Sequence, residues 1–216
     1  SRFVLTASNL VLGYDVPLTK QVDLKLERGQ KIAIRGTNGL GKSTLLKTLL
    51  GMIPPVAGSV EQGDFVSVGY FEQEISKGNQ NTAMEELWQE YPGMSNSEVR
   101  AALAACGLTN DHITTRMTAL SGGEAAKVRL CKIMQRPANL LVLDEPTNHL
   151  DLESITALND GLIRYPETIL FTSHDHQFVQ TVADRIIEVS GNTLLDRKGT
   201  YDEFLADFDE DQLKKY

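Results

Sequence analysis

Short apolar runs alternate along the chain with segments that have the spacing of an amphipathic helix. Near the N-terminus, the stretches FVLTASNLVLGY, VDLKL and KIAIR predict strands, because apolar and polar residues alternate with a period of two in VDLKL. A glycine-rich segment follows. The apolar positions after it are those of one helix face, and Gly51 suits a helix end: Leu45, Leu46, Leu49 and Leu50. The glycines therefore join a strand to a helix.

The middle of the chain changes character. PPVAGSVEQGD is rich in turn-forming residues, and FVSVGYFEQ after it predicts a strand in which Phe65, Ser67 and Gly69 face away from Val66, Val68 and Tyr70. TAMEELWQEY and SEVRAALAACGL then predict helices. With the amphipathic helix after LSGGE, they indicate an inserted helical lobe at about 79–135.

The second half returns to strands. NLLVL, TILFT, RIIEVS and TLLDR are apolar runs of strand length, and a helix is predicted from about Leu152, while the tail DFDEDQLKKY is expected to fray. Apolar strands alternating with helices are typical of a mostly parallel sheet covered on both faces. The fold class expected is therefore α/β.

Composition narrows the class of protein. A chain of 216 residues with 41% hydrophobic residues can bury the core of one domain. The net charge of -8 argues against nucleic-acid binding through an overall positive field, so any contact with RNA would be local. Cys106 and Cys131 do not form a C-x-x-C pair and are expected to be reduced, buried thiols without a metal or redox role.

The sequence contains no recognisable targeting signal. No apolar run approaches the roughly 20 residues that cross a bilayer, and SRFVLTASNL lacks the zones of a secretory signal. A cytoplasmic location is expected. Because the chain starts at Ser1 and not at methionine, it is interpreted as a fragment of a longer protein.

The glycine-rich segment matches a phosphate-binding loop. Gly36, Gly41, Lys42 and Ser43 satisfy G-x-x-x-x-G-K-[ST] between a predicted strand and a predicted helix. Glycines let backbone N–H groups turn toward phosphates, and the helix N-terminus adds a partial positive charge. Lys42 would reach the β- and γ-phosphates, and Ser43 would bind Mg²⁺. The alternative is a flexible loop with an incidental lysine.

Two acids follow the apolar strand LLVL. Asp144 and Glu145 stand where an open parallel sheet places its ligand, at the carboxyl ends of the strands. Asp144 suits the second protein contact to Mg²⁺, and Glu145 can polarise an attacking water. The alternative is a carboxylate pair that caps the turn before the helix near Leu152.

LSGGE, at 120–124, adds a family resemblance. With the phosphate loop and LLVLDEP, it makes the chain resemble the nucleotide-binding domain of the ATP-binding cassette (ABC) superfamily over nearly its whole length. The resemblance implies one P-loop NTPase domain over 1–216, with an N-terminal antiparallel β part. It also implies that the helical subdomain at about 79–135 carries the signature motif, and that the cofactors are ATP and Mg²⁺.

The resemblance also implies roles for single residues. Tyr14 would stack on adenine, Gln73 would sense Mg²⁺ and the attacking water, and His174 would contact the γ-phosphate. Taken alone, these three could be a half-buried aromatic, a solvated amide and a core histidine. His112, His149 and His176 are expected to be structural or solvent-facing. The remaining nucleotide contacts implied are Asn38, Gly39, Thr44, Ser121, Gly122 and Gly123.

In this superfamily two domains pair head to tail. Ser121, Gly122 and Gly123 open a predicted helix, so their backbone N–H groups would form a second anion site for the ATP held by the partner. The partner would be a second cassette in the same longer protein or a second copy of this chain. Alone, the chain is expected to be a weak ATPase.

PTNHLD, with Asn148 and His149, looks like the ABC-F branch, whose members carry two cassettes and act on ribosomes. VGYFEQE and the short helical lobe look like the second cassette of that branch. The expected function is therefore an ATP-gated translation factor that associates with the ribosome and its RNA. Two alternatives remain open: the motor subunit of a membrane transporter, and a binding module in which ATP acts as a clamp.

Two further features need an explanation. In SHDHQF, His176 stands where relatives usually carry Arg or Lys. Arg129, Lys132 and Arg136 form a basic stripe at helical spacing, expected to be a solvated face in preference to an RNA contact.

Overall fold

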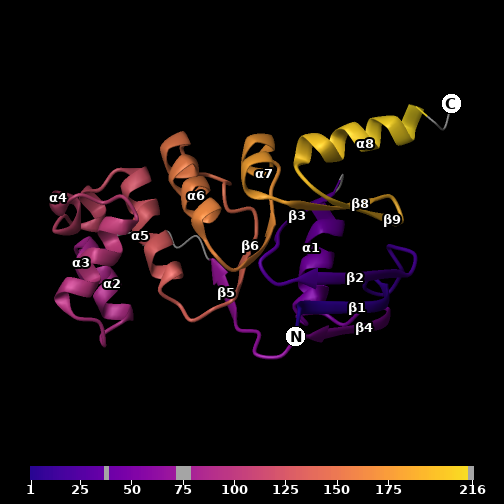
Figure 1. Cartoon of the computed structure of the whole chain (residues 1–216), viewed down its shortest axis with the longest axis horizontal. Helices are drawn as coiled ribbons and strands as arrows, with labels where there is room; N and C mark the ends of the chain where they lie inside the picture. Colours follow the sequence, from indigo (N-terminus) through magenta and orange to yellow (C-terminus); the bar gives the residue numbers. More distant parts are fainter. Residues whose placement is uncertain (37–38, 72–78, 214–216) are drawn as a thin grey trace. The chain divides into compact units, whose positions relative to one another are not determined.

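The computed structural model describes residues 1–36, 39–71 and 79–213 (Figure 1). The chain forms two compact units. Unit 1 comprises residues 1–70, 138–146 and 166–216, and unit 2 comprises residues 71–137 and 147–165. The helical lobe predicted at 79–135 falls within unit 2, which also takes in 147–165.

Unit 1 contains a six-stranded sheet in the order β5-β6-β7-β3-β8-β9. Strand β3 pairs in parallel with β7 and β8, β6 pairs in parallel with β7, and β9 is antiparallel to β8. The strands are β3 (Lys31–Gly36), β5 (Val68–Phe71), β6 (Leu140–Leu143), β7 (Thr168–Thr172), β8 (Arg185–Ser190) and β9 (Thr193–Lys198). Every residue of β6 and β7 is buried, as expected of parallel strands that read as continuous apolar runs. The predicted α/β class and mostly parallel sheet are confirmed.

A second, antiparallel sheet of unit 1 has the order β2-β1-β4. It consists of β1 (Phe3–Val11), β2 (Val22–Glu27) and β4 (Ala57–Gln62). Strand β4 lies in the stretch PPVAGSVEQGD, for which only turns were predicted, so that prediction was wrong. Five of its six residues are exposed and Val60 alone is half-buried, so this edge strand pairs through its backbone and has little apolar pattern to reveal it.

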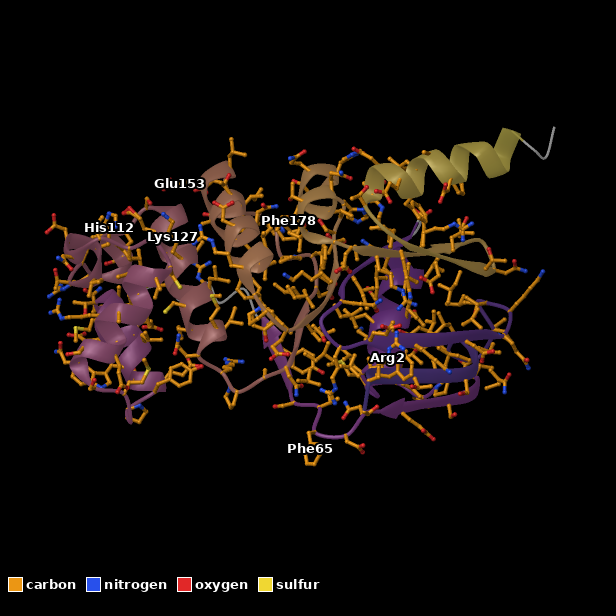
Figure 2. All side chains as sticks on the ribbon, in the orientation of Figure 1. Arg2, Phe65, His112, Lys127, Glu153 and Phe178 are labelled. Carbon is orange, nitrogen blue, oxygen red and sulfur yellow. The ribbon has the colours of Figure 1, made fainter. Side chains whose placement is uncertain are left out.

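The strand predicted from Phe65 begins only at Val68. Phe65 has a positive φ of 58° and is 95% exposed, so it stands in a turn (Figure 2). Asn139 holds this turn: its Nδ2 donates to the Phe65 carbonyl at 2.7 Å, and its Oδ1 accepts from the Ser67 N–H at 2.8 Å. Side-chain pairing from a distant segment overrides the alternation of apolar residues here.

Three helices of unit 1 follow strands of the large sheet. They are α1 (Gly39–Leu49), α7 (His176–Val182) and α8 (Tyr201–Leu213). Helix α1 ends as predicted: Gly51 has φ 73°, and the Met52 N–H donates to the Lys47 carbonyl at 2.9 Å. Helix α8 extends into the tail that was expected to fray. The Arg35 guanidinium lies 4.4 Å from the centre of the buried Tyr201 ring at its start.

Unit 2 is helical. It contains α2 (Ala83–Glu90), α3 (Asn96–Ala105), α4 (Asn110–Ile113), the 3-10 turn η1 (Met117–Ala119), α5 (Gly122–Met134) and α6 (Leu152–Arg164). Reciprocal capping boxes begin α2, α3, α4 and α5, because a Ser or Thr side chain accepts from the third helical residue and that residue's side chain accepts in return. In the described part of the chain, no helix is long and apolar enough to cross a membrane.

Candidate functional site

Three side chains from separate segments of unit 1 meet beyond the carboxyl ends of parallel strands. Lys42 is on α1, after β3, Glu145 follows β6, and His174 follows β7. The Lys42 ammonium donates to Glu145 Oε1 and lies 2.7 Å from His174 Nε2, which is 3.1 Å from the same Glu145 oxygen. Parallel strands place their carboxyl ends at one edge, and this edge is where open α/β sheets bind ligands.

Lys42 is buried, so its charge needs a partner within this cluster. Lys42 is 3% exposed, whereas the His174 side chain is 64% exposed. A buried ammonium is costly unless an anion neutralises it, and Glu145 supplies that anion here. His174 is not a core histidine, and Lys42 is not an incidental loop residue.

Thr172 links the two acids that follow β6. Its Oγ1 accepts from the Glu145 N–H at 2.8 Å and donates to Asp144 Oδ1 at 2.6 Å. Glu145 has a positive φ of 45°, so a specific hydrogen bond holds an uncommon backbone conformation. Sequence reasoning missed Thr172. Its signal was a hydroxyl at the end of the buried run TILFT, two residues before His174.

The capping alternative for the two acids is wrong. Helix α6 is capped by Asp151, whose Oδ1 accepts from the Ser154 N–H at 2.7 Å. These hydrogen bonds from Ser154 lower the pKa of Asp151 below its usual range. Asp144 and Glu145 are therefore not needed to begin this helix.

The residues proposed for Mg²⁺ are partly described. Ser43 is half-buried next to Lys42 on α1, and Asp144 is exposed at the end of β6. A hydroxyl and a carboxylate suit Mg²⁺, which keeps several waters and takes few protein ligands. Gln73 lies outside the described residues, as does Asn38. The donor set and the buried Lys42 cation fit Mg²⁺ and a triphosphate.

The remaining phosphate-loop residues surround the start of α1. Gly36 ends β3, Gly39 begins α1, and Gly41 and Thr44 are buried in its first turns. The Thr44 carbonyl also accepts from Thr48 Oγ1 at 2.7 Å. The first backbone N–H groups of a helix lack intrahelical partners, so this end of α1 suits an anion.

Tyr14 lies between β1 and β2 and is 59% exposed, so the half-buried alternative is wrong. Its neighbour Gly13 has φ 151°, and a Cβ at Gly13 would overlap the Val16 carbonyl oxygen, so the turn before Tyr14 needs glycine. The exposed ring is available for stacking.

The signature segment begins α5 in unit 2. Ser121 is the N-cap: its Oγ accepts from the Glu124 N–H at 3.2 Å and donates to carboxylate oxygens of Glu124 at 3.0 Å and Glu153 at 3.2 Å. The hydrogen bond from Ser121 is the main cause that lowers the pKa of Glu124. The capping box explains why a glutamate ends LSGGE.

Carboxylates from the start of α6 lie against the two signature glycines. A Cβ at Gly122 would collide with the Asp151 carboxylate, and one at Gly123 with the Glu153 carboxylate. Figure 2 labels Glu153 on α6. A larger residue at either position would push these carboxylates away from the start of α5. Sequence reasoning missed Glu153, whose signal was an acid two residues after Asp151 in LDLES.

Two residues of the basic stripe pair with glutamates of α2. The Lys132 side chain is 17% exposed and contacts Glu86 at 3.0 Å and Glu90 at 3.2 Å, so the expected solvated face is wrong for Lys132. Arg136, just after α5, contacts Glu90 at 3.2 Å and has a side chain 42% exposed. Burial lowers the pKa of Lys132, but the two glutamates outweigh it and raise the pKa above its usual value. Lys132 thereby ties α5 to α2.

Comparison with known proteins supplies the family. The model of the ABC transporter family matches residues 19–148, which include the phosphate loop, the signature and the acids after β6. The chain belongs to the ABC transporter family. It is a nucleotide-binding domain of that family, and the resemblance inferred from LSGGE is confirmed.

Individual relatives agree. This ABC domain is 52% identical over 182 residues to the uncharacterized ABC transporter ATP-binding protein YfmM of Bacillus subtilis (strain 168), covering 84% of the chain and 35% of that protein. It is 39% identical to ABC transporter F family member 2 of Arabidopsis thaliana, covering 94% and 31%. The chain therefore spans about a third of the length of these relatives.

The fold also matches a solved structure. CbiO1 of Clostridium perfringens, described as part of the ABC transporter complex cbiONQ, superposes with a TM-score of 0.73 at 20% identity, covering 95% of this chain and 92% of that one.

Proposed function

We propose that this ABC domain hydrolyses the ATP that it binds, and that it does so as half of a pair. The observation that carries the proposal is the contact of buried Lys42 with Glu145 and His174. A phosphate cradle alone would explain the lysine. A carboxylate and an imidazole at the same point supply the groups that hydrolysis needs for positioning water and phosphate.

The site residues proposed from the sequence then have the following roles. Lys42 and the N–H groups at the start of α1 would bind the phosphates, with Gly36, Asn38, Gly39, Gly41 and Thr44 as the other loop contacts, and Tyr14 would stack on adenine. Ser43, Gln73 and Asp144 would hold Mg²⁺, and the ion would neutralise charge on the phosphates. Glu145 orients the attacking water, and His174 contacts the γ-phosphate.

The Lys42 to Glu145 contact also bears on how phosphates would act at this site. Glu145 neutralises the buried Lys42 ammonium. Phosphate oxygens offer Lys42 a more highly charged partner, so ATP binding releases Glu145 toward water. Thr172 keeps the Glu145 backbone in place through this exchange.

Pairing follows from the second anion site. Ser121, Gly122 and Gly123 begin α5, and their N–H groups would face the γ-phosphate of ATP held by a partner. The partner is a second cassette in the same longer protein, or another copy of this chain in the isolated state.

The cellular role proposed is that of an ATP-gated, ribosome-associated translation factor in the cytoplasm. Support comes from PTNHLD and from a relative named as an F family member. A transporter motor is the second candidate, because other relatives are named as ABC transporter ATP-binding proteins. A third, an ATP-dependent clamp, would need Lys42 but not turnover.

The first experiment measures ATP turnover per mole of chain over a wide dilution series. We expect the specific activity to rise with concentration, because two chains must meet. Lys42→Ala should abolish it. Lys47→Ala is the matched control, since Lys47 is exposed in the last turn of the same helix. Constant specific activity would exclude pairing, and activity in Lys42→Ala would exclude the site.

A further inference from the structure

Cys106 and Cys131, which the sequence left as unrelated thiols, meet inside unit 2. Cys131 is fully buried on α5, and Cys106 is the half-buried C-cap of α3 that packs against the same apolar cluster. Each thiol shifts the pKa of the other, which indicates that they are neighbours within this cluster. Both are free thiols, as the sequence predicted, although Cys106 is half-buried and their proximity was not predicted.

A cavity of about 170 Å³ reaches one of the two thiols. Cys106 lines it, together with apolar residues and three charged ones, Lys127 on α5 and Asp160 and Arg164 on α6. The Lys127 side chain passes the residue after Cys106, since its Nζ would stand 3.7 Å from a Cβ at Gly107. Figure 2 labels Lys127 on α5. A water molecule takes up about 30 Å³ in the liquid, so a peroxide fits this space.

The surroundings make the two thiols unequal. The hydrogen bond from Cys131 lowers the pKa of Cys106, burial opposes it, and the charge of Arg164 lowers it further. The same hydrogen bond and deeper burial raise the pKa of Cys131. Cys106 is therefore the thiol that ionises more readily, and the thiolate is the form that reacts with oxidants.

We propose that Cys106 is a modification site for hydrogen peroxide, and that Cys131 resolves the product into a disulfide between the end of α3 and α5. The cavity between Lys127 and Arg164 admits the oxidant, and the buried neighbouring thiol is placed to attack next.

The chemistry balances in two steps. The Cys106 thiolate attacks one peroxide oxygen, so an S–O bond forms, the O–O bond breaks, and hydroxide leaves; the product is the sulfenic acid. The Cys131 sulfur then attacks the Cys106 sulfur, forming the S–S bond and breaking the S–O bond, and the hydroxyl leaves as water with the Cys131 proton. The hydroxide from the first step takes up the proton that Cys106 lost on ionising, so two thiols lose two electrons and two protons, and one peroxide becomes two waters.

The test exposes the chain to hydrogen peroxide, blocks remaining thiols with N-ethylmaleimide, and maps the products by mass spectrometry. We expect a disulfide within one chain that removes both maleimide adducts. In Cys131→Ser, dimedone should label Cys106 as the trapped sulfenic acid. In Cys106→Ser, Cys131 should stay reduced because it is buried. A chain that keeps both thiols at peroxide levels that oxidise free cysteine, or oxidation of Cys131 in Cys106→Ser, would overturn the proposal.

A second measurement tests whether the charge of Arg164, which lines the cavity, makes Cys106 more reactive. Arg164→Gln should slow the alkylation of Cys106 by iodoacetamide severalfold at neutral pH, since a rise of one pKa unit lowers the thiolate fraction about tenfold. Arg129→Gln is the matched control, because it removes the same charge from unit 2 at a position that does not line the cavity. Circular dichroism confirms that both variants fold. Equal slowing in the two variants, or none in Arg164→Gln, would contradict the assignment.

Discussion

At the scale of single residues, the hydroxyl of Thr172 holds both acids that follow β6. It is fully buried at the end of β7 and bonds both to the backbone of Glu145 and to the side chain of Asp144. A residue that would otherwise count as part of a buried strand therefore positions both the proposed metal ligand and the proposed water-orienting acid. Its effect on turnover would be indirect, through geometry.

We expect Thr172→Val to keep the fold and to lower kcat roughly tenfold to a hundredfold, because small displacements of reacting groups are costly. It should also lower the free energy of unfolding by about 1–3 kcal/mol, since the Glu145 N–H loses its partner. Steady-state kinetics and urea unfolding measure the two effects.

Thr168→Val is the matched control. Thr168 is buried at the other end of β7, where its Oγ1 accepts from the Gly29 N–H at 2.8 Å. It should lose similar stability and keep its kcat. If both variants lose turnover equally, Thr172 acts only through stability.

At the scale of elements, carboxylates at the start of α6 lie against the start of α5. Glu153 at the start of α6 accepts from Ser121 and covers Gly123 at the start of α5. A negative charge stabilises a helix N-terminus. The Glu153 carboxylate would also repel a phosphate brought to the same place, because it lies at the start of α5 where the second anion site is proposed.

We predict that Glu153→Gln lets ATP turnover appear at lower protein concentration than in the wild type, because a phosphate no longer competes with this carboxylate. The unfolding free energy should fall by about 0.3–1 kcal/mol from the lost helix-end interaction. Asp160→Asn, which removes an equal charge farther along α6, should leave the concentration profile unchanged. An unchanged profile in Glu153→Gln would reject the competition.

The contact of α2 with α5 depends on charge. Glu86 accepts from Asn79 at 2.6 Å, from Asn81 at 3.2 Å and from Lys132 at 3.0 Å. Burial raises the pKa of Glu86, but these hydrogen bonds outweigh it and lower the pKa below 4.5. A carboxyl with a depressed folded-state pKa stabilises the protein above the unfolded value and loses that stabilisation as the pH falls through the folded value.

We therefore expect Glu86→Gln to destabilise the chain at neutral pH, and the difference from wild type to shrink below about pH 4.5. Urea unfolding at several pH values measures it. A double-mutant cycle with Lys132→Met separates the pair from its surroundings. A stability difference that stays constant down to pH 3, or grows, would contradict the depressed pKa.

At the scale of the whole molecule, function requires more than this chain. The described part holds one phosphate cradle and one signature, and it spans about a third of the length of its relatives. The proposed composite site needs a cradle and a signature from different cassettes. The experiment that separates the two proposed functions, translation factor and transporter motor, therefore uses the longer protein that the sequence was interpreted to come from.

We predict that the full-length protein with Glu145→Gln co-sediments with ribosomes in ATP, because slowed hydrolysis should hold the cassettes closed. The other cassette of that protein stays unchanged, so that any effect comes from this domain. Lys42→Ala in the same protein should reduce co-sedimentation. If the Glu145→Gln protein instead remains in the supernatant in ATP, the translation role is rejected and a transporter motor becomes the stronger proposal.

The sequence by itself determined the features that depend on residues close together in the chain. Glycine spacing placed the phosphate loop between β3 and α1, and the apolar runs marked β6 and β7, because loop geometry and burial on both faces constrain neighbouring residues directly. LSGGE marked the start of α5, and the structure adds that Ser121 and Glu124 form a capping box there.

Only the tertiary structure decided the contacts between distant segments. Strand β4 follows from backbone pairing with β1, and the turn at Phe65 follows from Asn139. Thr172, Glu153 and the Cys106 to Cys131 contact join residues whose spacing has no periodic signature. Packing brings such groups together, and packing depends on the whole core and not on any local window of residues.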